Sequence, residues 1–276
     1  MGTMIQIPTN PEEAATVIKD FIKTYVRQAH ADGVVLGLSG GVDSAVVALL
    51  CKQALGKNKV LCLFMPEAAT PENDRRHQML FTKKFDIPCT TIDITPLVDT
   101  YIGALGARPP KKTLANIKAR ARMILLFAHA NHMNRLVCGT SNKSEMLVGY
   151  YTKYGDGGVD IQPIGDVYKT QIYELARYLG IPNPIIIKPP TAGLWVGQTD
   201  EGELKMKYDI LDQILMGLEC KLPTENIQRE AHVTKAQVQR IRTMRVRSQH
   251  KRRSPLIPKL GIRTPGLDWR SPVQEG

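Results

Sequence analysis

Residues 39–44, Ser-Gly-Gly-Val-Asp-Ser, place two hydroxyl groups, two glycines and a carboxylate in one short loop. The apolar run 34–38 precedes this loop and the apolar run 45–50 follows it, which predicts a buried strand, a tight turn and the start of a helix. Backbone N–H groups at a helix start bind oxyanions, and Gly40 and Gly41 let the backbone come close to the anion. The loop therefore predicts an anion site.

The side chains of this loop narrow the choice of ligand. Ser39 and Ser44 supply hydroxyl donors, but the loop has no lysine, so it differs from the GxxxxGK[ST] loop that binds the β- and γ-phosphates of ATP. The carboxylate of Asp43 would repel a phosphate unless a cation lay between them, and Mg²⁺ is the divalent ion that we expect there. An ordinary strand-to-helix turn is the alternative explanation.

A second polar segment follows another apolar run, residues 135–139. Thr140 and Glu145 lie in this segment, and ligands of open α/β sheets bind at the carboxyl ends of the strands. We therefore expect both residues to lie beside the loop 39–44, where Glu145 would supply a second carboxylate to the metal. Taken alone, the segment is better explained as a helix start with an acidic first turn.

The hydrophobic pattern predicts the sheet that would bring these groups together. Apolar runs typical of buried strands lie at 34–38, 59–65, 89–94 and 135–139. Helices are predicted at 10–31, 42–54, 71–85 and 113–131, with Asn10 and Thr113 as caps and with Leu80 and Phe81 turned inward. A loop is predicted over 95–113. Strands that alternate with helices predict an α/β fold, an open parallel sheet doubly wound with helices on both faces.

The rest of the chain is predicted to be helical, interrupted by two loops. The helices are expected at 166–180 (capped by Asp166), 203–218, 225–230 and 234–250, and the loops at 149–165 and 184–199. We predict a single domain over 1–255 that ends in a C-terminal helical extension, followed by a coil-like tail over 256–276.

The composition limits the class of protein. At 276 residues, 43% of them hydrophobic and 23% charged, the chain can bury a full core. It has no apolar run long enough to cross a bilayer and begins without a basic, apolar leader, so we expect a cytoplasmic protein without membrane contact. Five cysteines without C-x-x-C spacing argue against a metal cluster or a disulfide framework.

The net charge of +11 is concentrated near the C-terminus, since residues 231–267 hold ten Lys or Arg and no Asp or Glu. Such a basic region binds either nucleic acid or the phosphates of a small ligand. No Phe, Tyr or Trp lies among the basic residues of 240–253, so the stacking groups of single-strand binders are missing. This argues against a single-strand binder; the family resemblance described next implies a phosphorylated small molecule and no nucleic acid.

Several motifs together resemble a known family. The SGGxDS loop is similar to the pyrophosphate-binding loop of the N-type ATP pyrophosphatases, which cleave ATP between its α- and β-phosphates and adenylate a substrate oxygen. Within that superfamily the chain resembles the synthetase domain of NAD⁺ synthetases over residues 10–255. The motifs GT…E, GxxTKxGDGGxD, KxPTA and HKR occur in that order, at 139–145, 149–160, 188–192 and 250–252.

The resemblance implies a ligase that amidates deamido-NAD⁺ to NAD⁺ with ammonia, through an NAD-adenylate, and releases AMP and pyrophosphate from ATP. It implies Mg²⁺ on Asp43 and Glu145, no protein nucleophile, and a homodimer in which Arg120 contacts the dinucleotide across the interface. The ATP contacts that it implies are Gly37, Leu38, Ser39, Gly40, Gly41, Val42, Asp43, Ser44, Thr140, Lys169 and Thr191. The deamido-NAD⁺ contacts that it implies are Arg120, Lys153, Asp160, His250 and Lys251.

One position departs from the family pattern, because the loop that often reads PTADL has Gly193 in place of the acid. Free ammonia is the expected amide donor, with a separate glutaminase partner as the alternative source. The alternative functions are another N-type ATP pyrophosphatase, similar to GMP synthetase or to a tRNA thiolation enzyme, or a non-catalytic module that binds nucleotides or nucleic acid. The thiolation enzymes usually need reactive cysteines, and GMP synthetases lack the TKYGDGG run.

Overall fold

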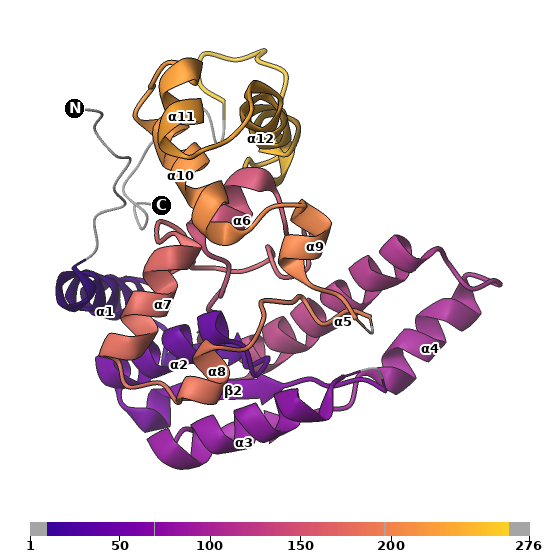
Figure 1. The fold of residues 1–276 in the computed structure, drawn as a ribbon. Helices are drawn as coiled ribbons and strands as arrows, with labels where there is room; N and C mark the ends of the chain where they lie inside the picture. The colour runs from indigo at the N-terminus through magenta and orange to yellow at the C-terminus, as the bar shows by residue number, and fades with distance from the viewer. Residues whose placement is uncertain (1–9, 69, 196, 265–276) are drawn as a thin grey trace.

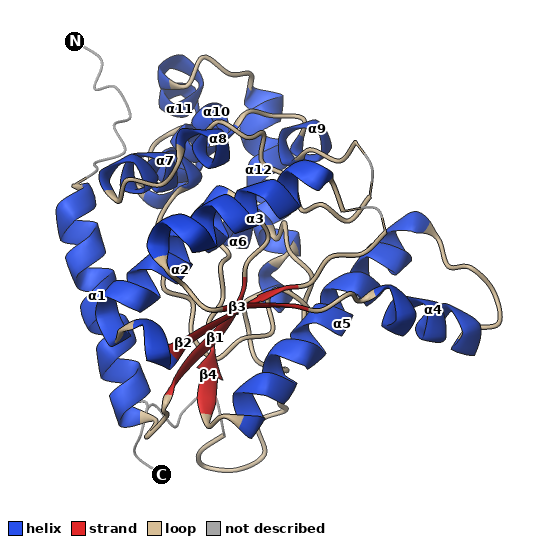
Figure 2. Ribbon diagram, turned by 90° about the horizontal axis from the view of Figure 1, so that it is seen from below, coloured by secondary structure: helices blue, strands red, loops and turns tan. Residues whose placement is uncertain are grey.

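A parallel sheet of four strands forms the centre of the fold (Figure 2). The computed structural model describes residues 10–68, 70–195 and 197–264. Its strands are β1 Gly33–Gly37, β2 Val60–Phe64, β3 Cys89–Thr91 and β4 Arg135–Val137. They are all parallel in the order β3-β2-β1-β4, so the strand order reverses between β1 and β4. Ligands of such sheets bind at the carboxyl ends of the strands beside that reversal.

Helices cover both faces of the sheet, as predicted. One face packs against α1 Pro11–Gln28, α2 Val42–Leu55, α3 Glu72–Phe85 and α7 Lys169–Tyr178. The other face packs against α4 Thr95–Ala104 and α5 Lys111–His132. The fully buried side chains of β1 explain this arrangement, because Val34 and Leu36 join the first core and Val35 joins the second. A strand that is buried on both faces is apolar throughout.

The C-terminal helices form a separate layer above the sheet (Figure 1). They comprise α6 Lys143–Val148, α9 Asp200–Leu204, α10 Tyr208–Glu219, α11 Thr224–Glu230 and α12 Lys235–Arg247, followed by a 3₁₀ turn over Gln249–Lys251. The short helix α8 Asn183–Ile186 instead packs into the first core through Ile185 and Ile186. Leu211, Ile214, Val238 and Ile241 form the centre of a third apolar core in this layer. Among the residues that the structure describes, no helix is long and apolar enough to cross a membrane.

Several predicted helix boundaries are confirmed. The Asn10 side chain accepts a hydrogen bond from the Glu13 N–H at 3.1 Å and so caps α1. The Gln237 side chain accepts from the Thr234 N–H at 2.8 Å, and Thr234 Oγ1 accepts from the Gln237 N–H at 3.2 Å, which completes the capping box of α12. Helix α2 ends at Gly56, whose φ of 85° favours glycine.

The prediction of a loop over 95–113 is wrong, because α4 occupies its first half. The Asp93 side chain accepts from the Thr95 N–H at 2.8 Å, and Val98 turns inward with 4% of its surface exposed. Glycines and prolines near the end of the segment hid this short helix. The predicted cap at Thr113 is also wrong, since α5 begins at Lys111.

Three further predictions are wrong, two of them in the second half of the chain and one on helix α3. Asp166 does not cap α7, which begins at Lys169; it lies 2.9 Å from Lys143 in an exposed ion pair. The helix predicted over 203–218 is two helices, α9 and α10, because Lys205 adopts a left-handed conformation that ends α9. Leu80 is 41% exposed, whereas its neighbour Phe81 is buried as predicted.

Candidate active site

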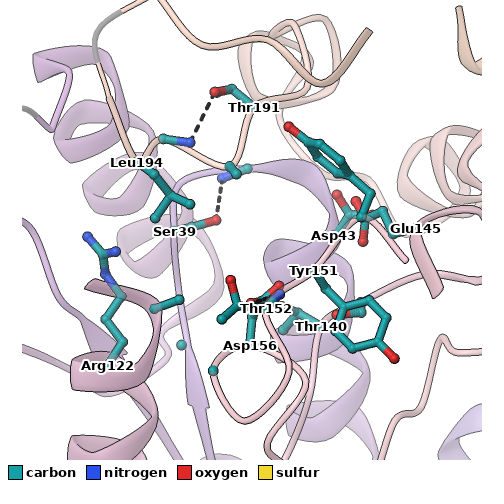
Figure 3. Close-up of a pocket in the computed structure, with 18 of the residues that line it drawn as sticks. Ser39, Asp43, Arg122, Thr140, Glu145, Tyr151, Thr152, Asp156, Thr191 and Leu194 are labelled. Carbon is teal, nitrogen blue, oxygen red and sulfur yellow. Dashed lines mark hydrogen bonds between the residues drawn. The ribbon is translucent and has the colours of Figure 1, made fainter. Parts of the chain in front are cut away.

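One cavity of about 1020 Å³ opens at the carboxyl ends of β1 and β4, and the structure brings most of the predicted site residues to it (Figure 3). Its volume is at the top of the range for a single small-ligand pocket, so it has room for more than one ligand. The predicted residues that line it are Gly37, Leu38, Ser39, Gly41, Val42, Asp43, Ser44, Arg120, Thr140, Glu145, Lys153, Lys169, Thr191, His250 and Lys251. Gly40 and Asp160 are not among the lining residues.

The loop between β1 and α2 is held by its own hydroxyl groups. Ser44 Oγ donates to the Gly41 carbonyl at 3.1 Å and accepts from the Ser39 N–H at 3.2 Å. Ser39 Oγ accepts from the Gly41 N–H at 3.3 Å, and the Ser39 side chain stays exposed to the cavity. Ser44 therefore shapes the loop, while Ser39 and the N-terminus of α2 face the cavity as anion donors.

Gly40 supports the loop from behind. Its φ is +79°, and a Cβ atom at this position would lie 2.6 Å from the backbone oxygen of Asp74. A backbone atom on the neighbouring helix α3 cannot move away as the end of a flexible side chain could. Only glycine therefore fits between the loop and α3.

Two carboxylates converge at the cavity, one from the start of α2 and one from α6 (Figure 3). Asn142, which is fully buried, holds both of them. Its amide Nδ2 donates to Asp43 Oδ1 at 3.0 Å, and its backbone N–H donates to Glu145 Oε2 at 3.2 Å. Its side-chain oxygen accepts from the Glu145 N–H at 3.0 Å. The capping box of α6 thus fixes the relative position of the two carboxylates.

Lys169 neutralises part of this negative charge. Its ammonium donates to Asp43 Oδ2 and lies 4.0 Å from Glu145 Oε1, with only 2% of the side chain exposed. Burial alone would lower the pKa of Lys169, but the charges of Asp43 and Glu145 raise the pKa above its usual value. Burial, and then the charge of Asp43, raise the pKa of Glu145 well above its usual value. The two carboxylates therefore repel each other, and a cation bound between them would relieve this repulsion.

The two carboxylates fit a magnesium ion better than a metal held by protein alone. No cluster of three or more His, Cys, Asp or Glu side chains with metal-binding geometry occurs in the part of the chain that the structure describes. Mg²⁺ is commonly bound through one or two carboxylates, with waters and substrate phosphates completing its shell. Asp43 and Glu145 supply hard oxygen ligands of this kind next to the anion loop.

The cavity is also lined by the basic residues Arg120, Lys153, His250 and Lys251. Arg120 Nη2 donates to the Lys153 carbonyl at 3.3 Å. Lys251 Nζ donates to the carbonyl oxygens of Gly149 and Tyr151, both at 2.6 Å. Lys251 thus shapes the loop after α6 in addition to facing the cavity.

Asp160 lies away from this cavity in a structural position. Its Oδ2 accepts from the Val137 N–H at 2.7 Å, and its own N–H donates to the Val137 carbonyl at 2.9 Å. The side chain therefore extends the hydrogen bonding of β4 at the sheet edge, which a turn motif alone does not reveal.

Residues 188–195 cross the cavity and are tied to the sheet side by one ion pair and one hydrogen bond. Lys188 pairs with Asp74 of α3, and Lys118 of α5 pairs with Glu67 while donating to the Leu194 carbonyl at 2.9 Å. A Cβ atom on Gly193 would lie 3.9 Å from Asp74 Oδ2. An acid at position 193 would thus face an existing carboxylate, which gives a physical reason for glycine at this place.

Sequence reasoning missed several residues around the cavity. Asn142 could have been found, because it stands three residues before Glu145 as in a capping box. Asp156 lines the cavity and accepts from the Thr152 N–H at 2.8 Å; burial raises its pKa. Arg252 caps the end of α6 by donating to the Met146 and Leu147 carbonyls at 2.6 and 3.0 Å. The contacts of Arg252 join residues 106 and 105 positions apart, so they leave no local signal.

Comparison with known proteins places this geometry in a family. Residues 14–255 match the family described as NAD synthase. The NH(3)-dependent NAD(+) synthetase of Methanosarcina acetivorans is 45% identical over 90% of this chain and 98% of the relative. The structure of NMN synthetase from Francisella tularensis superposes with a TM-score of 0.81 at 31% identity, covering 92% of this chain and 100% of that chain.

A longer protein also contains the fold. The glutamine-dependent NAD+ synthetase of Acinetobacter baumannii superposes with a TM-score of 0.70 at 29% identity, over 98% of this chain but 51% of that chain. The family match covers most of the sequence, and the relative from Methanosarcina acetivorans has nearly equal length. Both agree with the cavity, which holds the carboxylate pair, the lysine and the anion loop. The chain belongs to the NAD synthase family.

Proposed function

We propose that this chain is an ammonia-dependent NAD⁺ synthetase, which uses ATP to convert deamido-NAD⁺ to NAD⁺ and releases AMP and pyrophosphate. The observation that carries the proposal is the cluster of Asp43, Glu145 and Lys169 beside the anion loop, within a cavity of a NAD synthase family member. The name of the 45% identical relative supports ammonia as the amide donor.

The reaction requires positioning rather than a protein nucleophile. The nicotinate carboxylate of deamido-NAD⁺ attacks the α-phosphorus of ATP, so that pyrophosphate leaves and an acyl-adenylate forms. Ammonia then attacks the acyl carbon, AMP leaves, and a proton is lost to give the amide. Because the substrate carboxylate is itself the nucleophile, alignment and charge stabilisation are what the protein contributes.

The anion loop and the lysine would bind the leaving pyrophosphate. Ser39 and the N–H groups at the start of α2 face the cavity, and Lys169 lies beside them on α7. We assign the remaining ATP contacts to Thr140 and Thr191, which line the same cavity. Mg²⁺, held by Asp43 and Glu145, would neutralise charge on the phosphates when bound.

The basic residues of the cavity would bind the dinucleotide. Arg120, Lys153 and Lys251 provide positive charge in the cavity, as the pyrophosphate of deamido-NAD⁺ requires, and His250 lines the same cavity. Asp160 is left out of this set, since its carboxylate accepts from the backbone of β4. Positive side chains and a carboxylate pair in one cavity support a site in which both substrates meet.

A second candidate substrate is the mononucleotide. One of the proteins with a closely similar fold is an NMN synthetase, so this fold is compatible with a mononucleotide substrate. Deamido-NAD⁺ is favoured because the relative with the higher identity, 45% against 31%, is an NAD(+) synthetase. The two substrates share the nicotinate carboxylate and differ only in the adenylyl half, so a direct comparison separates them.

The activity assay tests both substrates. Purified protein with ATP, Mg²⁺ and ammonium chloride is given either deamido-NAD⁺ or nicotinate mononucleotide, and the nucleotide products are separated by chromatography. We expect NAD⁺, AMP and pyrophosphate in equal amounts, with kcat/KM at least tenfold higher for deamido-NAD⁺. Formation of ADP, or AMP release that does not depend on either nicotinate compound, would contradict the proposal.

A homodimer is part of the proposal. Helix α4 and the adjoining end of α5 project away from the body of the molecule (Figure 1). Leu97 and Tyr101 of α4 are both 39% exposed, and Leu105, directly after α4, is 57% exposed. Ile124, in the second half of α5, is 49% exposed. Exposed apolar side chains on one arm indicate an interaction surface, and Arg120 lies on the same helix as Ile124. A second copy of the chain would cover this surface.

Sedimentation tests the dimer. We expect twice the chain mass of 30.7 kDa for the wild type, and a shift to the monomer for the double variant Leu105→Glu/Ile124→Glu. Val17→Glu on α1, where Val17 is also exposed, is the matched control and should stay dimeric. A monomeric wild type, or dissociation caused by the α1 control alone, would contradict this arrangement.

A further inference from the structure

Asp212 is a fully buried carboxylate on α10, in the C-terminal layer and outside the cavity lining. A buried carboxylate must have hydrogen-bond donors around it. Its Oδ1 accepts from the Ser144 hydroxyl, and its Oδ2 accepts from the N–H and the hydroxyl of Thr170 at 2.9 and 3.0 Å. Burial raises the pKa of Asp212 to about 6, against the opposing effect of these bonds.

The donors of Asp212 belong to the first turns of the two helices that carry site residues. Lys169 and Thr170 are the first two residues of α7, and the Lys169 N–H donates to Ser144 Oγ at 2.9 Å. Asp212 and Ser144 together therefore cap the start of α7 from outside that helix. The N–H groups of a helix start lack partners within the helix, so their external acceptors set where the helix begins.

Each capped position is adjacent to a charged group in the cavity. Lys169 carries the ammonium that pairs with Asp43, and Ser144 is followed directly by Glu145. A shift of α7 would move the lysine away from the carboxylates, and a shift of Ser144 would move Glu145. The contacts of Asp212 reach both groups through one or two hydrogen bonds.

We propose that Asp212 is a positioning residue for the ATP side of the site, which fixes Lys169 through the start of α7 and Glu145 through Ser144. This inference rests on the proposed function. In this arrangement Asp212, on the C-terminal helix α10, aligns charged side chains at the edge of the sheet. The dinucleotide side is held by other contacts, such as those of Lys251 with the carbonyls of Gly149 and Tyr151, so it should be affected much less.

The test compares Asp212→Asn and Ser144→Ala with a matched control. Thr234→Ala removes a cap of the same kind at α12, where the bond from the Gln237 N–H lies outside the cavity lining. Pyrophosphate–ATP exchange with deamido-NAD⁺, in the absence of ammonia, gives kcat and both KM values, and thermal melts give Tm. We expect KM for ATP to rise at least tenfold in the first two variants, KM for deamido-NAD⁺ to stay within twofold, and only Tm to fall in the control.

A milder variant covers the case in which Asp212→Asn fails to fold. Thr170→Val removes one hydroxyl donor and keeps the N–H bond, so it should raise KM for ATP by about threefold. Equal increases in both KM values, or variants that lower Tm without changing KM for ATP, would overturn the proposal. If wild type shows no exchange, the proposed function fails separately, and calorimetric binding of ATP to the same variants then decides the role of Asp212.

Discussion

Asp43→Asn is expected to reduce adenylation by about 1,000-fold or more, because it removes a charged metal ligand at the phosphates. The loss of one such ligand removes several kcal/mol of transition-state stabilisation, and each 1.4 kcal/mol is a factor of ten in rate. Asparagine keeps the size of the side chain, and Glu145 still lies 4.0 Å from Lys169, so the fold should survive with a lower Tm. The measurement is pyrophosphate–ATP exchange, with thermal melts to confirm folding.

Two variants make this result specific. Asp20→Asn on the exposed surface of α1 removes a carboxylate far from the cavity and should keep full exchange. Glu145→Gln should lose exchange activity as Asp43→Asn does. The double variant should lose no more activity than either single variant, because the two carboxylates act on one ion. Wild-type-like AMP release by Asp43→Asn would remove this residue from the metal site.

The part of the site on neighbouring strands could be predicted from the sequence. The loop after β1 and the segment after β4 follow apolar strands directly, and parallel strands bring their carboxyl ends to one edge of the sheet. Asp43 and Glu145 therefore meet as expected, within reach of one ammonium. Local signals are sufficient where the chemistry lies at a strand end.

Contacts between distant segments could not be predicted in this way. Asp212 lies 68 residues from Ser144, and Asp74 lies 114 residues from Lys188, so neither pair has a spacing that a sequence pattern can reveal. Asp160 is a different case: it stands in a glycine-rich motif, and in this structure its carboxylate accepts a hydrogen bond from the backbone of β4 and does not line the cavity. Helix α4 was missed because composition suggested a loop, whereas Asp93 and the buried side of Val98 stabilise a helix.

Lys169→Met should destabilise the protein strongly in the absence of metal, and Mg²⁺ should restore much of the loss. Methionine keeps the apolar stem but leaves Asp43 and Glu145 without their cation, and loss of one partner from a buried ion pair costs about 3–5 kcal/mol. The side chains of Asp43 and Glu145 are 19% and 16% exposed to the cavity. The expected loss in the free energy of unfolding therefore lies near the lower end of this range. The measurement is urea unfolding, first with a chelator and then with increasing Mg²⁺.

The response to Mg²⁺ separates a metal site from a structural ion pair. In the wild type Lys169 competes with the ion for the carboxylates, so Mg²⁺ alone should stabilise the wild type less than the variant. A ligand at 100 times its Kd adds about 2.7 kcal/mol to the free energy of unfolding, which urea titration resolves. Lys143→Met, which removes a lysine paired with Asp166 and Glu219 away from the cavity, is the matched control. It should lose stability without gaining a Mg²⁺ response, and Lys169→Met/Asp43→Asn should lose that response. A Mg²⁺ effect of equal size in the wild type and all three variants would mean that the ion binds away from Asp43 and Glu145. Only the changes at Lys169 and Asp43 alter that carboxylate pair.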